Sequence, residues 1–181
     1  MDFFMEEETN LLRRVVNWVT DIIVVIALAC FTVYAFGSQV TVAGNSMSPL
    51  LNSGDVVLMN QLSVHLGKPD RFDVVVFQRE DRKTNIKRVI GLPGETVQII
   101  NGQIFVDGVA LEGPAGQKKI ALAGLAENPV KLGADEYFLL GDNRDSSEDS
   151  RFSNVGNVKA EQIIGTVWFR ILPALELGRI Q

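Results

Sequence analysis

The hydrophobic pattern divides the chain into two unlike parts. Residues 22–36 form an apolar run of 15 residues without a charge, whereas the chain after residue 39 has short apolar runs separated by turns and charged residues. As a helix, the apolar run would be only about 22 Å long, which is short for a hydrocarbon core of about 30 Å. Extending it to residues 18–39 closes the gap and places Trp18 at one interface. The pattern therefore predicts one transmembrane helix over residues 18–39.

Basic residues near this helix predict its orientation. Arg13 and Arg14 precede it, and no further Lys or Arg occurs until Lys68. Because cytoplasmic flanks are enriched in Lys and Arg, we expect residues 1–17 in the cytoplasm. Residues 40–181 would then form an extracytoplasmic domain of a single-pass protein of the cell membrane.

Two other interpretations of the apolar run stay open. A small-x-small triplet, Ala35-Phe36-Gly37, follows the run and suits a cleaved secretory signal. A buried helix of a soluble protein would also be apolar, but the run shows no polar face. The membrane anchor is the favoured interpretation.

The rest of the chain has the pattern of short β-strands. Asn101-Gly102 separates two apolar runs, and this dipeptide is the strongest short-range signal for a hairpin with a type I′ turn. Residues 113–132 are rich in Gly, Ala and Lys and predict a surface loop. No long helical periodicity follows the membrane segment, so we expect a compact all-β domain of mostly antiparallel sheets. The predicted strands are residues 56–59, 73–77, 96–100, 103–106, 136–140 and 163–169.

Composition narrows the possible functions. A chain of 181 residues suits one domain with an appendage. The net charge of −5 and a pI of about 4.9 argue against nucleic acid as the main partner, because phosphate binding needs a basic face. The lone Cys30 excludes an intramolecular disulfide, and a Ser-His-Asp triad is possible only through the single histidine, His65.

A serine and a lysine offer another route to an activated nucleophile. Ser46 lies in Gly-Asn-Ser-Met-Ser-Pro, and Lys87 opens Lys-Arg-Val-Ile-Gly-Leu-Pro-Gly-Glu. At the ordinary lysine pKa of about 10.4, roughly one side chain in a thousand is neutral near pH 7.4. Burial against Ile86 and Val89, and the like charge of Arg88, are expected to lower the pKa of Lys87. Taken alone, Ser46 would be a turn residue and Lys87-Arg88 a solvated charged pair.

Four segments together resemble the sequence boxes of bacterial type I signal peptidases, also called leader peptidases. They occur in the family's order behind a membrane anchor: Ser46–Pro49, Gly54–Val57, Lys87–Glu95 and Gly141–Arg151. The resemblance implies the β-fold that these peptidases share with repressor autoproteases. It further implies a membrane-anchored serine endopeptidase that cleaves signal peptides from exported preproteins after Ala-x-Ala-like sequences. Its partners would be secretory preproteins and membrane lipid, without nucleic acid, metal or cofactor.

The same resemblance implies the roles of individual residues. Ser46 would be the nucleophile and Lys87 the general base, with substrate extended between the strands that enter them. Met47, Leu51 and Ile86 would line the substrate pocket. Around the dyad, Ser147 would hydrogen-bond and orient Lys87, while Asp142 pairs with Arg88 and Asp149 with Arg151. Although residues 141–151 are acidic, they lack the glycine and distal glutamate of an EF-hand calcium loop.

The sequence departs from the family at two positions. Gly44 stands where some members carry a serine that helps to bind the oxyanion, so the backbone N–H of Ser46, alone or with another backbone group, must serve this purpose. Leu50 stands where threonine is usual. The short interval between Lys87 and Asp142 also implies that any accessory β-domain is absent or reduced.

Two other functions fit the sequence less well than the peptidase. A self-cleaving repressor would need a DNA-binding domain and a cleavable Ala-Gly, but Ala43-Gly44 lies too near Ser46 to fold back into the site. An inactive membrane-anchored binding module would not need an intact Ser46, Lys87 and Ser147. Eukaryotic-type relatives carry histidine where Lys87 stands, so the resemblance is to the bacterial type.

Overall fold

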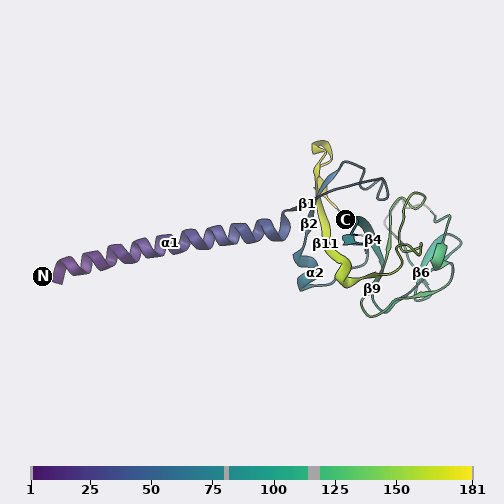
Figure 1. The fold of residues 1–181 in the computed structure, drawn as a ribbon, viewed down its shortest axis with the longest axis horizontal. Coiled ribbons are helices and arrows are strands. Elements are labelled where there is room, and N and C mark those ends of the chain that lie inside the picture. Colours follow the sequence, from purple (N-terminus) through teal and green to yellow (C-terminus); the bar gives the residue numbers. More distant parts are fainter. Residues whose placement is uncertain (1, 80–81, 114–118, 181) are drawn as a thin grey trace.

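A computed structural model describes residues 2–79, 82–113 and 119–180 and shows a long helix attached to a β-domain (Figure 1). Helix α1 (Asp2–Phe36) extends away from the domain, and its segment Arg13–Tyr34 is long and apolar enough to cross a membrane, by length and composition. None of that segment is buried by the rest of the protein. Helix α1 ends at Phe36, and β1 begins at Ser38 and pairs with β2, so the helix is shorter at this end than the predicted span 18–39.

An eight-stranded antiparallel sheet forms the larger part of the domain. Along the sheet the strands follow the order β1-β2-β11-β3-β4-β9-β10, and β12 pairs with β11. Segments distant in sequence therefore lie side by side, and β4 is placed between β3 and β9. The strands are β1 (Ser38–Thr41), β2 (Val56–Asn60), β3 (Val74–Gln78), β4 (Thr84–Gly91), β9 (Glu136–Leu140), β10 (Val158–Lys159), β11 (Ile163–Leu172) and β12 (Gly178–Arg179).

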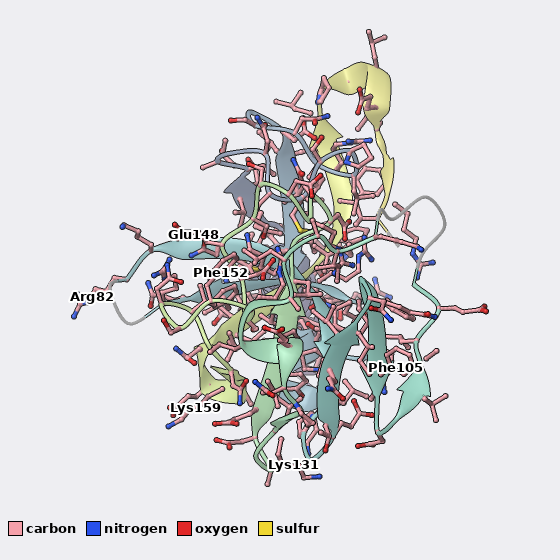
Figure 2. All side chains as sticks on the ribbon, turned by 90° about the vertical axis from the view of Figure 1, so that its right-hand side faces the viewer. Arg82, Phe105, Lys131, Glu148, Phe152 and Lys159 are labelled. Carbon is pink, nitrogen blue, oxygen red and sulfur yellow. The ribbon has the colours of Figure 1, made fainter. Side chains whose placement is uncertain are left out.

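A second, four-stranded sheet has the order β7-β6-β5-β8. Its strands are β5 (Thr96–Ile100), β6 (Gln103–Val106), β7 (Val109–Ala110) and β8 (Val130–Lys131). The predicted hairpin is confirmed: Asn101 and Gly102 have φ values of 52° and 80°, as a type I′ turn requires. Figure 2 shows Phe105 of this sheet on the opposite side of the domain from Glu148.

The remaining regular elements are short. Helix α2 (Leu62–Leu66) contains His65 and contacts β11. Three 3₁₀ turns are η1 (Gly124–Glu127), η2 (Ala160–Gln162) and η3 (Ala174–Glu176). Within the predicted loop 113–132, η1 and β8 are ordered elements, while residues 114–118 lie outside the described part of the chain. The predicted all-β architecture behind an apolar helix is confirmed.

One part of the hydrophobic core lies directly beneath the turn that carries Ser46. Met47 and Leu51, which follow Ser46, are buried together with Val57, Val76 and Ile86. These side chains come from the turn itself and from β2, β3 and β4. Because buried apolar contacts resist displacement, this packing holds the Ser46 turn against β4.

Candidate active site

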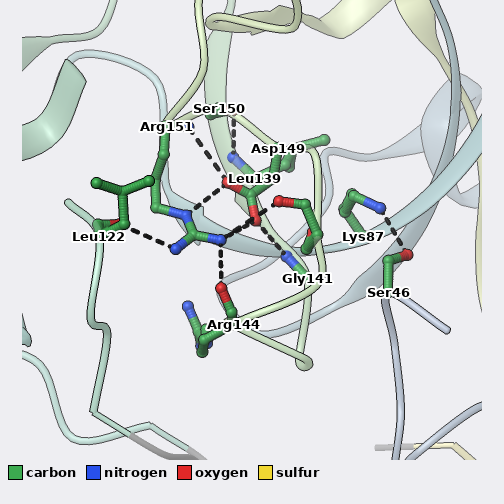
Figure 3. Close-up of polar contacts among 10 residues, drawn as sticks. Ser46, Lys87, Leu122, Leu139, Gly141, Arg144, Asp149, Ser150 and Arg151 are labelled. Carbon is green, nitrogen blue, oxygen red and sulfur yellow. Dashed lines mark hydrogen bonds and ion pairs between the residues drawn. The ribbon is translucent and has the colours of Figure 1, made fainter. Parts of the chain in front are cut away.

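The structure brings Ser46 and Lys87 into direct contact. Lys87 Nζ lies 2.7 Å from Ser46 Oγ, although the two residues are 41 positions apart in the chain (Figure 3). Ser46 occupies a turn in which the Ser48 N–H donates to the Asn45 carbonyl. Lys87 lies within β4, opposite Val75 of β3. A rigid strand thus presents the amine to a hydroxyl on a tight turn.

The protein environment lowers the pKa of Lys87 from 10.5 to about 8. Burial is the main cause, since the side chain is only 2% exposed. Asp149 and Glu148 oppose the shift, and Arg79 adds to it. With a pKa of about 8, about one lysine in five is neutral near pH 7.4, compared with one in a thousand at the ordinary value.

The prediction that Arg88 lowers the pKa of Lys87 was wrong. The arginine whose positive charge lowers this pKa is Arg79. Consecutive residues of a strand point to opposite faces, so Arg88 leaves β4 on the side away from Lys87. There it forms a bidentate pair with Asp142, with Nε–Oδ1 and Nη2–Oδ2 distances of 2.8 and 2.7 Å. The predicted Arg88–Asp142 pair is confirmed, and its carboxylate offsets the arginine charge.

The second predicted ion pair, between Asp149 and Arg151, is also confirmed (Figure 3). Arg151 Nε and Nη2 lie 2.8 and 3.0 Å from the two carboxylate oxygens of Asp149. Both side chains are almost completely buried, at 1% and 0% exposure. Arg151 also donates to the carbonyls of Leu122 and Arg144, and Asp149 accepts from the Gly141 N–H. This network fixes the loop 141–151 next to the dyad.

Ser147 does not make the hydrogen bond that was predicted for it. Its hydroxyl is buried and has no hydrogen-bond partner among the described residues, while the amine of Lys87 contacts Ser46 instead. The Ser147 hydroxyl packs tightly over Gly141, where any Cβ would clash with it and with the Ser46 carbonyl. Ser147 therefore lies close to the nucleophile turn without orienting Lys87 through a hydrogen bond.

A small pocket opens beside Ser46. It has a volume of about 70 Å³ and is lined by residues 40–43, Ser46 and Met47 together with Thr84, Asn85 and Ile86 of β4. Two of the predicted pocket residues, Met47 and Ile86, do line it. Leu51 does not line it: it is fully buried in the core below, and its part in substrate binding stays a prediction. A larger groove of about 730 Å³ lies between β3 and β10 and contains neither dyad residue.

Two unpaired strand edges border this pocket. In the described part of the chain, β1 pairs only with β2, which leaves its other edge open. Strand β9 pairs with β4 from Arg88 onward, so residues 84–87 have a strand partner only on the β3 side. Free N–H and C=O groups on both sides can pair with an inserted extended peptide.

Sequence reasoning missed three residues that shape the site. Asn143 contacts the nucleophile turn twice: its backbone N–H donates to the Ser46 carbonyl at 3.0 Å, and its Nδ2 to the Asn45 carbonyl at 3.1 Å. Glu148 and Arg79, which form an ion pair at 3.3 Å, both influence Lys87. Their polar surroundings in the sequence give no periodic signal, and only the fold places them near the dyad.

Comparison with known proteins gives consistent matches over most of the chain. Residues 15–172 match the family described as "Signal peptidase, peptidase S26". Signal peptidase I S of Bacillus subtilis (strain 168) is 32% identical, over 96% of this chain and 97% of that protein. Signal peptidase I of Bacillus amyloliquefaciens is 34% identical over the same shares of both chains.

A relative from another genus and a solved structure also match this chain. Signal peptidase I of Leptolyngbya laminosa is 36% identical over 87% of this chain and 78% of that protein. The crystal structure of a signal peptidase I from Enterococcus faecalis V583 covers 55% of this chain and 96% of its own, with 30% identity and a TM-score of 0.46.

Proposed function

This chain belongs to the signal peptidase family, peptidase S26, and from that premise we propose that it cleaves preproteins with Ser46 as nucleophile and Lys87 as general base. As a family member it is a serine endopeptidase that acts on the signal peptides of secretory preproteins. The observation that supports the dyad is the 2.7 Å contact between Ser46 Oγ and the buried amine of Lys87.

The chemistry follows from that contact. Neutral Lys87 takes the proton of Ser46 as Oγ attacks the scissile carbonyl carbon. The charge that develops on the carbonyl oxygen is stabilised by the backbone N–H of Ser46. Lysine then gives its proton to the departing amine, which leaves an ester on Ser46. Neutral Lys87 next deprotonates a water molecule that hydrolyses this ester, and Ser46 recovers its proton.

Substrate specificity would come from the pocket and the two free strand edges. A signal peptide lying extended between β1 and residues 84–87 would be bound mainly through its backbone. The pocket of about 70 Å³ has room for a few waters at most, so it suits a small side chain such as that of alanine. This arrangement supports cleavage after Ala-x-Ala-like sequences.

The same proposal includes a membrane anchor with a defined orientation. Residues 1–17 would be cytoplasmic, the apolar part of α1 would span the membrane, and residues 40–181 would form the extracytoplasmic peptidase domain. The arginines before the span support this orientation. Protease added to intact spheroplasts should degrade the domain that carries Ser46, whereas protection until lysis would reverse the orientation.

The nucleophile can be tested directly. Ser46→Ala should abolish cleavage of a precursor with an Ala-x-Ala site, measured in detergent, while the melting temperature stays near that of the wild type. Ser153→Ala, at an exposed serine in another loop, is the matched control and should retain full activity. Near-normal cleavage by folded Ser46→Ala would refute the proposed dyad.

A further inference from the structure

We infer that Asn143 is a positioning residue that aims the backbone N–H of Ser46 at the oxyanion of the transition state. The inference rests on the proposed role of Ser46 as nucleophile. Its geometric basis is a double contact: the Asn143 side-chain amide donates to the Asn45 carbonyl at 3.1 Å, and the Asn143 backbone N–H donates to the Ser46 carbonyl at 3.0 Å. One residue thus holds the peptide groups on both sides of Ser46.

Peptide planarity connects the first of these bonds to the oxyanion. The Asn45 carbonyl and the Ser46 N–H belong to the same planar trans peptide group and point in opposite directions. Fixing the direction of the carbonyl therefore fixes the direction of the N–H. A hydrogen bond to the carbonyl also polarises the peptide group, which makes its N–H a better donor.

The site depends on this backbone donor because residue 44 has no side chain that could assist. Gly44 has a φ of 82°, is exposed, and carries no hydroxyl. The Asn45 carbonyl also accepts the Ser48 N–H at 3.2 Å, but that bond lies within the turn and moves with it. The Asn143 amide instead ties the peptide group to a separate element.

That element is itself firmly held. Asp142, which precedes Asn143, forms the bidentate pair with the buried Arg88. Bidentate arginine–carboxylate pairs fix geometry as well as adding energy. Asn143 can therefore hold the Ser46 N–H in its direction before substrate binds, which is the condition for effective electrostatic stabilisation of a transition state.

Two substitutions test the donor without enlarging the side chain. Asn143→Asp keeps the shape and replaces the donor by an acceptor, and Asn143→Ala removes the contact. Loss of an oxyanion donor lowers kcat by about 100- to 1,000-fold. In these variants the Ser46 N–H, which is the oxyanion donor, is kept but loses its alignment. We therefore expect kcat to fall about 10- to 100-fold in both variants. In Asn143→Ala, KM and the acidic limb of the pH profile should stay unchanged, because this variant adds no charge near Lys87. Asn143→Asp adds a carboxylate beside the turn that contacts Lys87, so its limb should move to higher pH.

Inhibition by a peptide aldehyde separates this role from a merely structural one. The aldehyde carbon bonds to Ser46 Oγ, the electron pair of its C=O bond moves onto oxygen, and Lys87 takes the serine proton. The adduct therefore carries an oxyanion, whereas the corresponding peptide alcohol binds without one. Both variants should lose aldehyde affinity by about the factor lost in kcat and keep their affinity for the alcohol. Equal loss for both inhibitors would overturn the inference.

Control variants separate the role of Asn143 from the proposed role of Ser46 as nucleophile. Asn157→Ala removes an amide that donates to Glu136 at 2.8 Å, away from the dyad, and should leave kcat unchanged. Melting curves identify the folded variants, and if Asn143→Asp does not fold, Asn143→Ala decides. An active Ser46→Ala would refute the proposed function. An inactive Ser46→Ala together with a wild-type kcat in the folded Asn143 variants would refute this inference alone.

Discussion

The buried amine of Lys87 predicts that removing it stabilises the protein while abolishing its activity. The pKa falls from 10.5 to about 8 on folding, and at about 1.36 kcal/mol per pKa unit this corresponds to a cost of roughly 3 kcal/mol for the charged form. Lys87→Met removes that cost but also the hydrogen bond to Ser46, which contributes about 0.5–1.5 kcal/mol. Near pH 7 the free energy of unfolding of Lys87→Met should therefore exceed that of the wild type by about 2 kcal/mol. For a chain of this size this difference raises Tm by roughly 4–8 °C.

The gain should depend on pH in a defined direction. Below pH 8 the lysine is charged in both the folded and the unfolded wild type, so the variant has its full advantage. Between pH 8 and 10.5 the unfolded wild-type chain holds a proton on Lys87 that the folded protein lacks. Wild-type stability therefore rises with pH relative to the variant. The advantage of the variant should vanish before pH 10.5, where only its loss of the hydrogen bond to Ser46 remains.

The assay compares the two full-length proteins in detergent. Thermal melts at intervals from pH 7 to 10.5 give the difference in Tm, and precursor cleavage gives the activity. Lys119→Met, at an exposed lysine, is the matched control and should show no such difference. The reasoning would be refuted if folded Lys87→Met were no more stable than the wild type at pH 7, or if its advantage were constant over the whole range.

Two further predictions concern the surroundings of the dyad. The acidic limb of the kcat/KM profile should lie near pH 8. Glu148→Gln should move this limb to lower pH, because Glu148 raises the pKa of Lys87 while its ion-pair partner Arg79 lowers it. A limb that does not move at low salt would contradict this prediction. Arg151→Met leaves the buried carboxylate of Asp149 without its partner and should cost about 3–5 kcal/mol in urea unfolding; a cost below 1 kcal/mol would contradict it.

The sequence was sufficient wherever the structural signal is local. The hairpin at Asn101-Gly102 depends on two adjacent φ angles, and the apolar helix on one continuous run of residues. The Arg88–Asp142 and Asp149–Arg151 pairs came from the resemblance to a family, since nothing local relates Arg88 to a residue 54 positions away. Fold class and charge pairing were therefore predicted for different reasons.

The sequence could not predict the direction in which particular side chains point. Leu51 lies on the same turn as Met47, yet only Met47 reaches the pocket, because the turn directs Leu51 into the core. Ser147 lies over Gly141 rather than against the amine of Lys87. Rotamers and the path of a loop decide such contacts within a few ångströms, and neither leaves a periodic pattern in the sequence.

The adjacent residues Lys87 and Arg88 show how one strand separates two uses of positive charge. Side chains alternate across β4, so Lys87 reaches Ser46 while Arg88 reaches Asp142 on the other side. The base must lose its proton near neutral pH, and a buried lysine with a pKa of about 8 can do so. The bracing residue must keep its charge and bind a carboxylate through two bonds, which suits guanidinium. Because a shift of one residue in register would exchange these positions, the pairing of β4 with β3 and β9 determines which cation becomes the base.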